Sequence, residues 1–125
     1  MISGKVTSER EAIVPLQIEA PDGALVSVEA VIDTGFTESI ALPPEQVAEL
    51  GLPLRGAEWV TLGDGRETAL WVHDAIVHWH GRRVCVPAFE TEGGTLIGMA
   101  LLQGSRLMLD VTPDGAVRIE PLGSA

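Results

Sequence analysis

The fold of this chain follows from one stretch, Val28-Glu29-Ala30-Val31-Ile32-Asp33-Thr34-Gly35. Its apolar residues predict a strand that ends at Asp33. A carboxyl group at such a strand end is unusual for structure alone, because apolar neighbours raise the free-energy cost of its charged form. Thr34 can hydrogen-bond locally through its hydroxyl group, and Gly35 leaves room for another backbone or a substrate to approach. The stretch therefore predicts a carboxyl group held in place with one side exposed.

Short apolar runs separated by turn residues extend from this stretch in both directions. They predict strands about ten residues apart, with one short helix at 43–51 and one or two helical turns at 99–103. Pro15 indicates an edge strand near the N-terminus. The remaining strands are expected at 13–18, 26–32, 60–62, 68–72, 75–77, 84–86, 96–97, 107–111 and 116–119. This spacing predicts an all-β fold, either a barrel or a sandwich.

Length and composition limit the class of protein. The 125 residues predict a single domain, 1–125, in which a C-terminal hairpin occupies about 106–120. The formal net charge of -10 argues against nucleic-acid binding, which relies on clustered Lys and Arg. No stretch predicts a membrane span, and the first five residues lack the apolar core of a signal peptide. Cys85 is the only cysteine, so we expect a cytoplasmic protein with no intrachain disulfide.

A second motif lies far downstream, Leu96-Ile97-Gly98-Met99-Ala100-Leu101-Leu102. Between it and Asp33-Thr34-Gly35, residues 60–72 predict a hairpin with the glycine-rich tip Gly63-Asp64-Gly65. Over about residues 12–111, these features occur in the order seen in retropepsin-like aspartic proteases of clan AA. The chain most resembles the single-domain, non-viral members in which Phe follows the triplet, as Phe36 does here. The resemblance implies an acid-protease barrel with one or two short helices.

The resemblance also implies an activity, that of an aspartic endopeptidase without metal or organic cofactor. Hydrolysis of a peptide bond by two carboxyl groups needs one ionised and one protonated partner. This chain offers one suitable residue, Asp33, so the second carboxyl group would come from Asp33′ of another copy across a two-fold axis. A homodimer acting on a peptide or protein substrate is therefore expected.

The resemblance assigns a role to several residues. Asp33 is the expected catalytic residue, Thr34 supports the pair across the dimer axis, and Gly35 presents its backbone to the substrate. The tip Gly63-Asp64-Gly65 resembles the flap that closes over a bound peptide. The expected substrate-binding residues are Val31, Gly35, Phe36 and Leu96.

The chain departs from viral members of the family at two positions. Those members carry an acidic residue two positions after the triplet and an arginine directly after the glycine of the second motif. Thr37 and Met99 occupy these positions here, so both charged partners are missing together.

Other interpretations of these residues stay open at this point. Asp33-Thr34-Gly35 could be an ordinary turn, and the fold could serve as a catalytically silent peptide-binding or dimerisation module. His78 and His80 could bind a metal with His73 or Cys85, although four-ligand zinc spacing is absent. Cys85 could also be a nucleophile, but its position between Val84 and Val86 predicts a small buried side chain.

Overall fold

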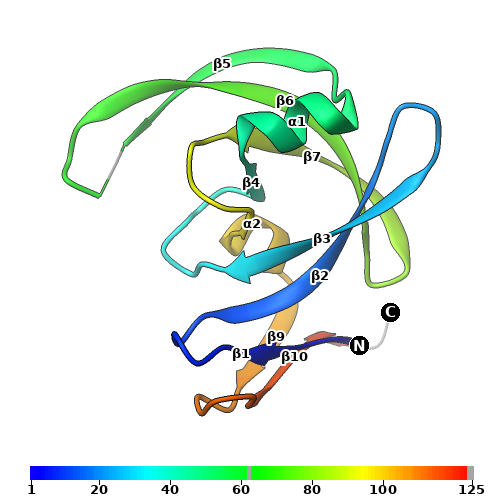
Figure 1. Cartoon of the computed structure of the whole chain (residues 1–125), viewed down its shortest axis with the longest axis vertical. Helices are drawn as coiled ribbons and strands as arrows, with labels where there is room; N and C mark the ends of the chain where they lie inside the picture. The colour runs from blue at the N-terminus through cyan, green and yellow to red at the C-terminus, as the bar shows by residue number, and fades with distance from the viewer. Residues whose placement is uncertain (62, 124–125) are drawn as a thin grey trace.

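The computed structural model describes residues 1–61 and 63–123, which form an all-β fold with two short helices (Figure 1). The elements are β1 (Ile2–Val6), β2 (Ala12–Glu19), β3 (Leu25–Ile32), β4 (Ile40–Leu42), α1 (Pro44–Leu50), β5 (Leu54–Thr61), β6 (Glu67–Trp79), β7 (Arg82–Glu90), β8 (Leu96–Ile97), α2 (Met99–Leu102), β9 (Ser105–Leu109) and β10 (Ala116–Pro121). The all-β prediction is confirmed. Within the described ranges, neither helix has the length and apolar content needed to cross a membrane.

The strands belong to one sheet, in the order β5-β6-β7-β4-β8-β3-β2-β1-β10-β9. A further pairing joins β2 to β6, through Gln17↔His78, Ile18↔Val77 and Glu19↔Ile76. Because of this pairing, the run of strands from β6 to β2 returns on itself and encloses the core.

The core follows from alternating burial along the strands. On β2, Val14, Leu16 and Ile18 are almost fully buried, whereas Pro15 and Gln17 are exposed. Such alternation is expected because successive side chains of a strand point to opposite faces of the sheet. The same buried cluster includes Ile40 and Leu42 of β4, Ile97 of β8 and Leu101 and Leu102 of α2. The elements that carry the two motifs therefore share one apolar core.

Helix α1 confirms the helix predicted at 43–51. Pro44 occupies its first turn, where the missing N–H of proline costs no helical hydrogen bond. Gly51 ends the helix in the left-handed conformation (φ 66°), and its N–H donates to carbonyl groups of the last turn. Val47 and Leu50 pack into the core, which fixes the helix beside β4.

Several details of the strands differ from the expectations. β6 is one strand of 13 residues, where separate strands were predicted at 68–72 and 75–77. β1 and β4 were not predicted, and β5 begins at Leu54, earlier than the strand predicted at 60–62. β1 pairs with both β2 and β10. β2 is an inner strand, not the edge strand that Pro15 indicated: Pro15 lies between the residues that pair with β1 and those that pair with β6.

The C-terminal hairpin joins the sheet through β10, which lies between β1 and β9. Ile2↔Ile119 and Gly4↔Val117 are among the pairs that join β10 to β1. β10 thus covers the outer edge of β1 and leaves β9 as the last strand of the sheet.

Candidate active site

Asp33 lies directly after β3, at the start of a tight loop, and is partly exposed. Its backbone N–H donates a hydrogen bond to the carbonyl oxygen of Ile97 (2.9 Å), which anchors the loop to β8. The N–H of Gly35 donates to Oδ1 of Asp33 (2.9 Å), and the N–H of Phe36 donates to the Asp33 carbonyl oxygen (3.1 Å). One carboxylate oxygen is therefore held by the backbone of its own loop.

The strands around Asp33 bring the two motifs together. β3 runs parallel to β8, with the pairs Val31↔Leu96 and Ile32↔Ile97. β4 pairs with the other side of β8, through Ile40↔Ile97 and Ala41↔Leu96. The short strand β8 is thus enclosed by the strands before and after the Asp33 loop.

The start of α2 fixes the far side of that loop. The N–H groups of Gly98, Met99 and Ala100 donate to the carbonyl oxygens of Ser39 (2.9 Å), Phe36 (2.8 Å) and Glu38 (3.3 Å), respectively. A side chain at Gly98 has no room, because a Cβ atom there would lie 2.1 Å from the Glu38 carbonyl oxygen. Residues 36–39 are therefore locked against the second motif.

A cleft of about 540 Å³ opens beside the loop. Its walls come from the 35–38 loop, Ala41 of β4, residues 59–61 of β5, Leu70 of β6, and Thr91, Gly93 and Leu96. Of the predicted substrate-binding residues, Gly35, Phe36 and Leu96 line this cleft. Val31 does not: it is half-buried in the sheet, where it pairs with Leu96. Asp33 itself lies next to the cleft wall, and Thr34 is exposed.

Phe36 has a structural contact in addition to its place in the cleft. Its ring meets the ring of Phe89 edge-on, with the ring centres 6.2 Å apart and the planes at 88°. Phe89 is fully buried in β7. An edge-to-face pair of this kind stabilises the loop by aromatic packing.

The hairpin of β5 and β6 reaches over the same side of the molecule as the loop that follows β3 (Figure 1). Its strands pair up to Thr61↔Glu67, and its tip holds Gly63, Asp64 and Gly65. Leu62, which was included in the predicted strand 60–62, lies outside the described residues. Trp59, Val60, Thr61 and Leu70 bring the hairpin into the cleft wall.

The charge at the hairpin tip is paired. Oδ2 of Asp64 accepts a hydrogen bond from Nε of Arg66 (2.6 Å), and Oδ1 accepts one from the Arg66 backbone N–H (3.0 Å). These bonds, the backbone one foremost, hold the pKa of Asp64 below its ordinary value. The carboxylate is therefore ionised and offset by the neighbouring guanidinium group.

The histidines do not gather into one site. In the described part of the chain, no group of three or more His, Cys, Asp or Glu side chains is arranged to hold a metal ion. Each histidine instead bonds to a different partner: His73 to Glu90 (3.0 Å), His78 to Glu19 (2.7 Å) and His80 to Ser105 (2.8 Å). Cys85 is exposed, contrary to the buried position expected, because it points away from the core while Val86 points inward.

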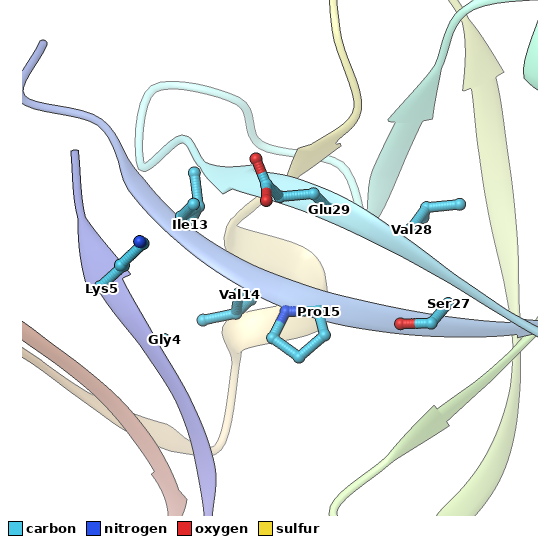
Figure 2. Close-up of a pocket in the computed structure, with 8 residues that line it drawn as sticks. All are labelled: Gly4, Lys5, Ile13, Val14, Pro15, Ser27, Val28 and Glu29. Carbon is cyan, nitrogen blue, oxygen red and sulfur yellow. The ribbon is translucent and has the colours of Figure 1, made fainter.

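A second hollow of about 300 Å³ lies between β1, β2 and β3 (Figure 2). It forms where β1 and β2 diverge, since these strands pair only at Lys5↔Ile13 and Val6↔Ala12. Lys5 and Glu29 bring opposite charges to its rim, and none of the predicted site residues lines it. The cleft beside Asp33 is therefore the better candidate for a catalytic site.

Several residues of that cleft were missed by the sequence interpretation, namely Glu38, Ala41, Trp59, Thr91 and Gly93. Glu38 follows Asp33 by five residues, and its proximity to the triplet was an available signal. The others reach the cleft only through the pairing of β5 with β6 and the path of the loop after β7, for which the local sequence offers no signal.

The structure is similar to that of a retropepsin-like aspartic protease from Rickettsia conorii. The two chains are 16% identical, and the match covers 92% of this chain and 84% of the other, with a TM-score of 0.57. This chain therefore has the retropepsin-like fold that its two motifs predicted. No protein-family model and no curated protein matches the sequence.

Proposed function

We propose that this chain is an aspartic endopeptidase that acts as a homodimer, with Asp33 and Asp33′ as the catalytic pair. One observation carries the proposal: a partly exposed carboxylate, held by the Gly35 N–H at 2.9 Å, stands at a strand end beside a cleft of about 540 Å³. A rigidly held carboxylate beside a cleft suits general acid–base chemistry. The retropepsin-like fold supports the same assignment.

The pair would divide the chemistry between its two members. Two carboxyl groups about 3 Å apart cannot both ionise, so they share one proton. The ionised member takes a proton from a bound water, whose oxygen attacks the peptide carbonyl carbon while the protonated member donates to the carbonyl oxygen. The C–N bond then breaks as the nitrogen takes up a proton, which releases an acid and an amine. The titration belongs to the pair and not to either residue.

The need for a second copy follows from what one chain supplies. Each chain carries one Asp-Thr-Gly triplet and so supplies one carboxyl group of this kind. The hairpin carboxylate of Asp64 is paired with Arg66. An isologous dimer would bring Asp33 and Asp33′ together at its axis. Thr34, which is exposed beside Asp33, would hydrogen-bond across that axis.

The β5–β6 hairpin would act as the flap. Gly63, Asp64 and Gly65 form its tip, and Val60 and Leu70 line the cleft beneath. Closure over a bound peptide would exclude water from the reacting groups. An extended peptide would bond to the hairpin backbone and place alternate side chains in the apolar parts of the cleft.

Aromatic packing would replace the charged support that viral members have. Thr37 is exposed at the cleft and Met99 is exposed at the start of α2, so neither position carries a charge. The edge-on contact of Phe36 with buried Phe89 holds the same loop from beneath.

A single cysteine suits a reducing compartment, and we propose that the enzyme works in the cytoplasm.

The test is cleavage of an unfolded protein substrate between about pH 3 and pH 7, a range that covers the titration of paired carboxyl groups. Asp33→Asn should lower the rate by at least about a hundredfold, because it removes the acid–base function. A pepstatin-type inhibitor should block the wild type. Asp22→Asn is the matched control, since Asp22 lies in another turn and its Oδ1 accepts an N–H from Ala24 at 2.9 Å.

Retention of full activity by the Asp33→Asn variant would rule out the proposed mechanism. Absence of cleavage at every pH by a confirmed dimer would favour the alternative, a silent peptide-binding or dimerisation module on the same fold.

A further inference from the structure

The cleft beside Asp33 has an uneven distribution of charge. Of the described residues that line it, Glu38 is the only one with a charged side chain, and the rest are apolar residues, threonines and glycines. None of these described lining residues is a lysine or an arginine. Apart from the proposed Asp33 pair beside the cleft, a peptide that enters it therefore meets one charged side chain, that of Glu38, in the described lining.

The position of Glu38 is fixed by its backbone. Its carbonyl oxygen accepts the N–H of Ala100 at 3.3 Å, and the neighbouring Ser39 carbonyl oxygen accepts the N–H of Gly98 at 2.9 Å. Gly98 packs so closely that a Cβ atom there would overlap the Glu38 carbonyl oxygen. Because the loop cannot shift without breaking these contacts, the backbone that carries the Glu38 side chain is held in place at the cleft wall.

Among residues 1–61 and 63–123, no cation pairs with the carboxylate of Glu38. The ion pairs among the described residues involve other acidic side chains, those of Glu19, Asp64, Asp74, Glu90, Asp114 and Glu120. Glu38 is already half-buried in the free chain. A bound peptide would remove more water from it, and an unpaired carboxylate in that position costs free energy unless the peptide supplies a positive charge.

We propose that this cleft selects peptides that place a lysine or arginine side chain against Glu38. The proposal rests on the proposed peptide-cleaving function and names its substrate class. The net charge of -10 acts in the same direction, because it attracts cationic peptides before they reach the cleft.

The experiment maps cleavage sites in a peptide library whose positions on both sides of the scissile bond are randomised. Wild type should enrich Lys and Arg at one position. In Glu38→Gln that enrichment should fall by about five- to tenfold, as expected for loss of one partly buried ion pair. Glu38→Asp, which keeps the charge, should keep a preference for basic residues.

The matched control is Glu92→Gln. Glu92 is exposed in the loop between Thr91 and Gly93, but it is not among the residues that line the cleft. The Glu92→Gln substitution removes one negative charge from the same region. A preference for basic residues that came from general electrostatics would therefore fall in both variants. Absence of basic enrichment, or equal enrichment in wild type and Glu38→Gln, would overturn the proposal.

Peptide binding separates this proposal from the proposed activity. Asp33→Asn should bind a lysine-containing peptide more tightly than the same peptide with norleucine, which keeps the aliphatic chain without the ammonium group, as measured by fluorescence anisotropy. If wild type cleaves nothing but this difference is present and depends on Glu38, the protease assignment fails and the selectivity stands. Equal affinities for the two peptides would overturn the selectivity even if cleavage is observed.

Discussion

At the scale of single residues, Gly98 determines whether the two motifs can meet. A Cβ atom at this position would lie 2.1 Å from the Glu38 carbonyl oxygen and 2.6 Å from the ring of Phe36. Gly98→Ala should therefore lower the free energy of unfolding by about 1–3 kcal/mol, the usual cost of overpacking. Urea unfolding measures the change. The control is Gly94→Ala, where a Cβ atom would meet nothing within 4 Å, and an equal loss of stability in both variants would contradict the packing argument.

Single residues also mark how far the sequence could predict the site. The position of Asp33 at a strand end was predictable, because the apolar run before it and Gly35 after it are local signals. Val31 is not among the residues that line the cleft, although its strand partner Leu96 is, and its role in substrate binding stays a prediction. Which face of β3 meets the cleft depends on the parallel pairing with β8, a contact between residues 65 positions apart (96 minus 31).

At the scale of elements, Glu19 joins three strands. From β2, it accepts hydrogen bonds from Arg83 of β7 (2.6 and 3.1 Å) and contacts His78 of β6 (2.7 Å). These partners, Arg83 foremost, lower the pKa of Glu19 from 4.5 to about 2. A carboxyl group whose pKa is depressed on folding stabilises the fold above its unfolded pKa, and this contribution is lost as the pH falls toward the folded value.

Glu19→Gln should therefore melt at a lower temperature than wild type at neutral pH. The difference should shrink as the pH falls below about 4.5 and vanish near about 2, following the pKa values of the unfolded and folded states. Thermal unfolding followed by circular dichroism across this range gives the comparison. Glu9→Gln serves as the control, since Glu9 is exposed and forms none of the ion pairs of the described residues. A difference between wild type and Glu19→Gln that does not change with pH would refute the assignment.

The elements show why strand boundaries were harder to predict than strand existence. β6 continues through His73 and Asp74, whose polar side chains indicated a break between two strands. In the structure, His73 is buried and bonded to Glu90, and Asp74 pairs with Arg55. Partners distant in sequence thus allow polar residues inside a strand, and one sequence window does not contain them.

At the scale of the whole molecule, β10 determines which edge of the sheet is open to a second copy of the chain. It covers β1, so the end strand on this side of the sheet is β9, and β5 is the end strand on the other side. Met108 and Leu109 of β9 are exposed, at 41% and 40%, and Val111, two residues after the strand, is exposed at 64%. Exposed apolar residues on an edge strand are the type of surface that a symmetric partner can cover. The proposed dimer therefore does not require a free edge on β1, which is already paired with β10 of its own chain.

A dimer that shares its catalytic pair has a consequence for mixtures of subunits. Asp33→Asn chains should fold and associate like wild type, because the side chain is nearly the same size and its Oδ1 can still accept the Gly35 N–H. A mixed dimer then holds one carboxyl group instead of two and cannot supply the acid and the base together. Adding excess Asp33→Asn to wild type, with time for exchange, should reduce activity per wild-type chain roughly to the wild-type fraction of the mixture. Excess Asp22→Asn, which leaves both members of the pair intact, should cause no loss. Activity per wild-type chain that stays constant with added Asp33→Asn, while sedimentation shows that subunits exchange, would mean that each chain works alone.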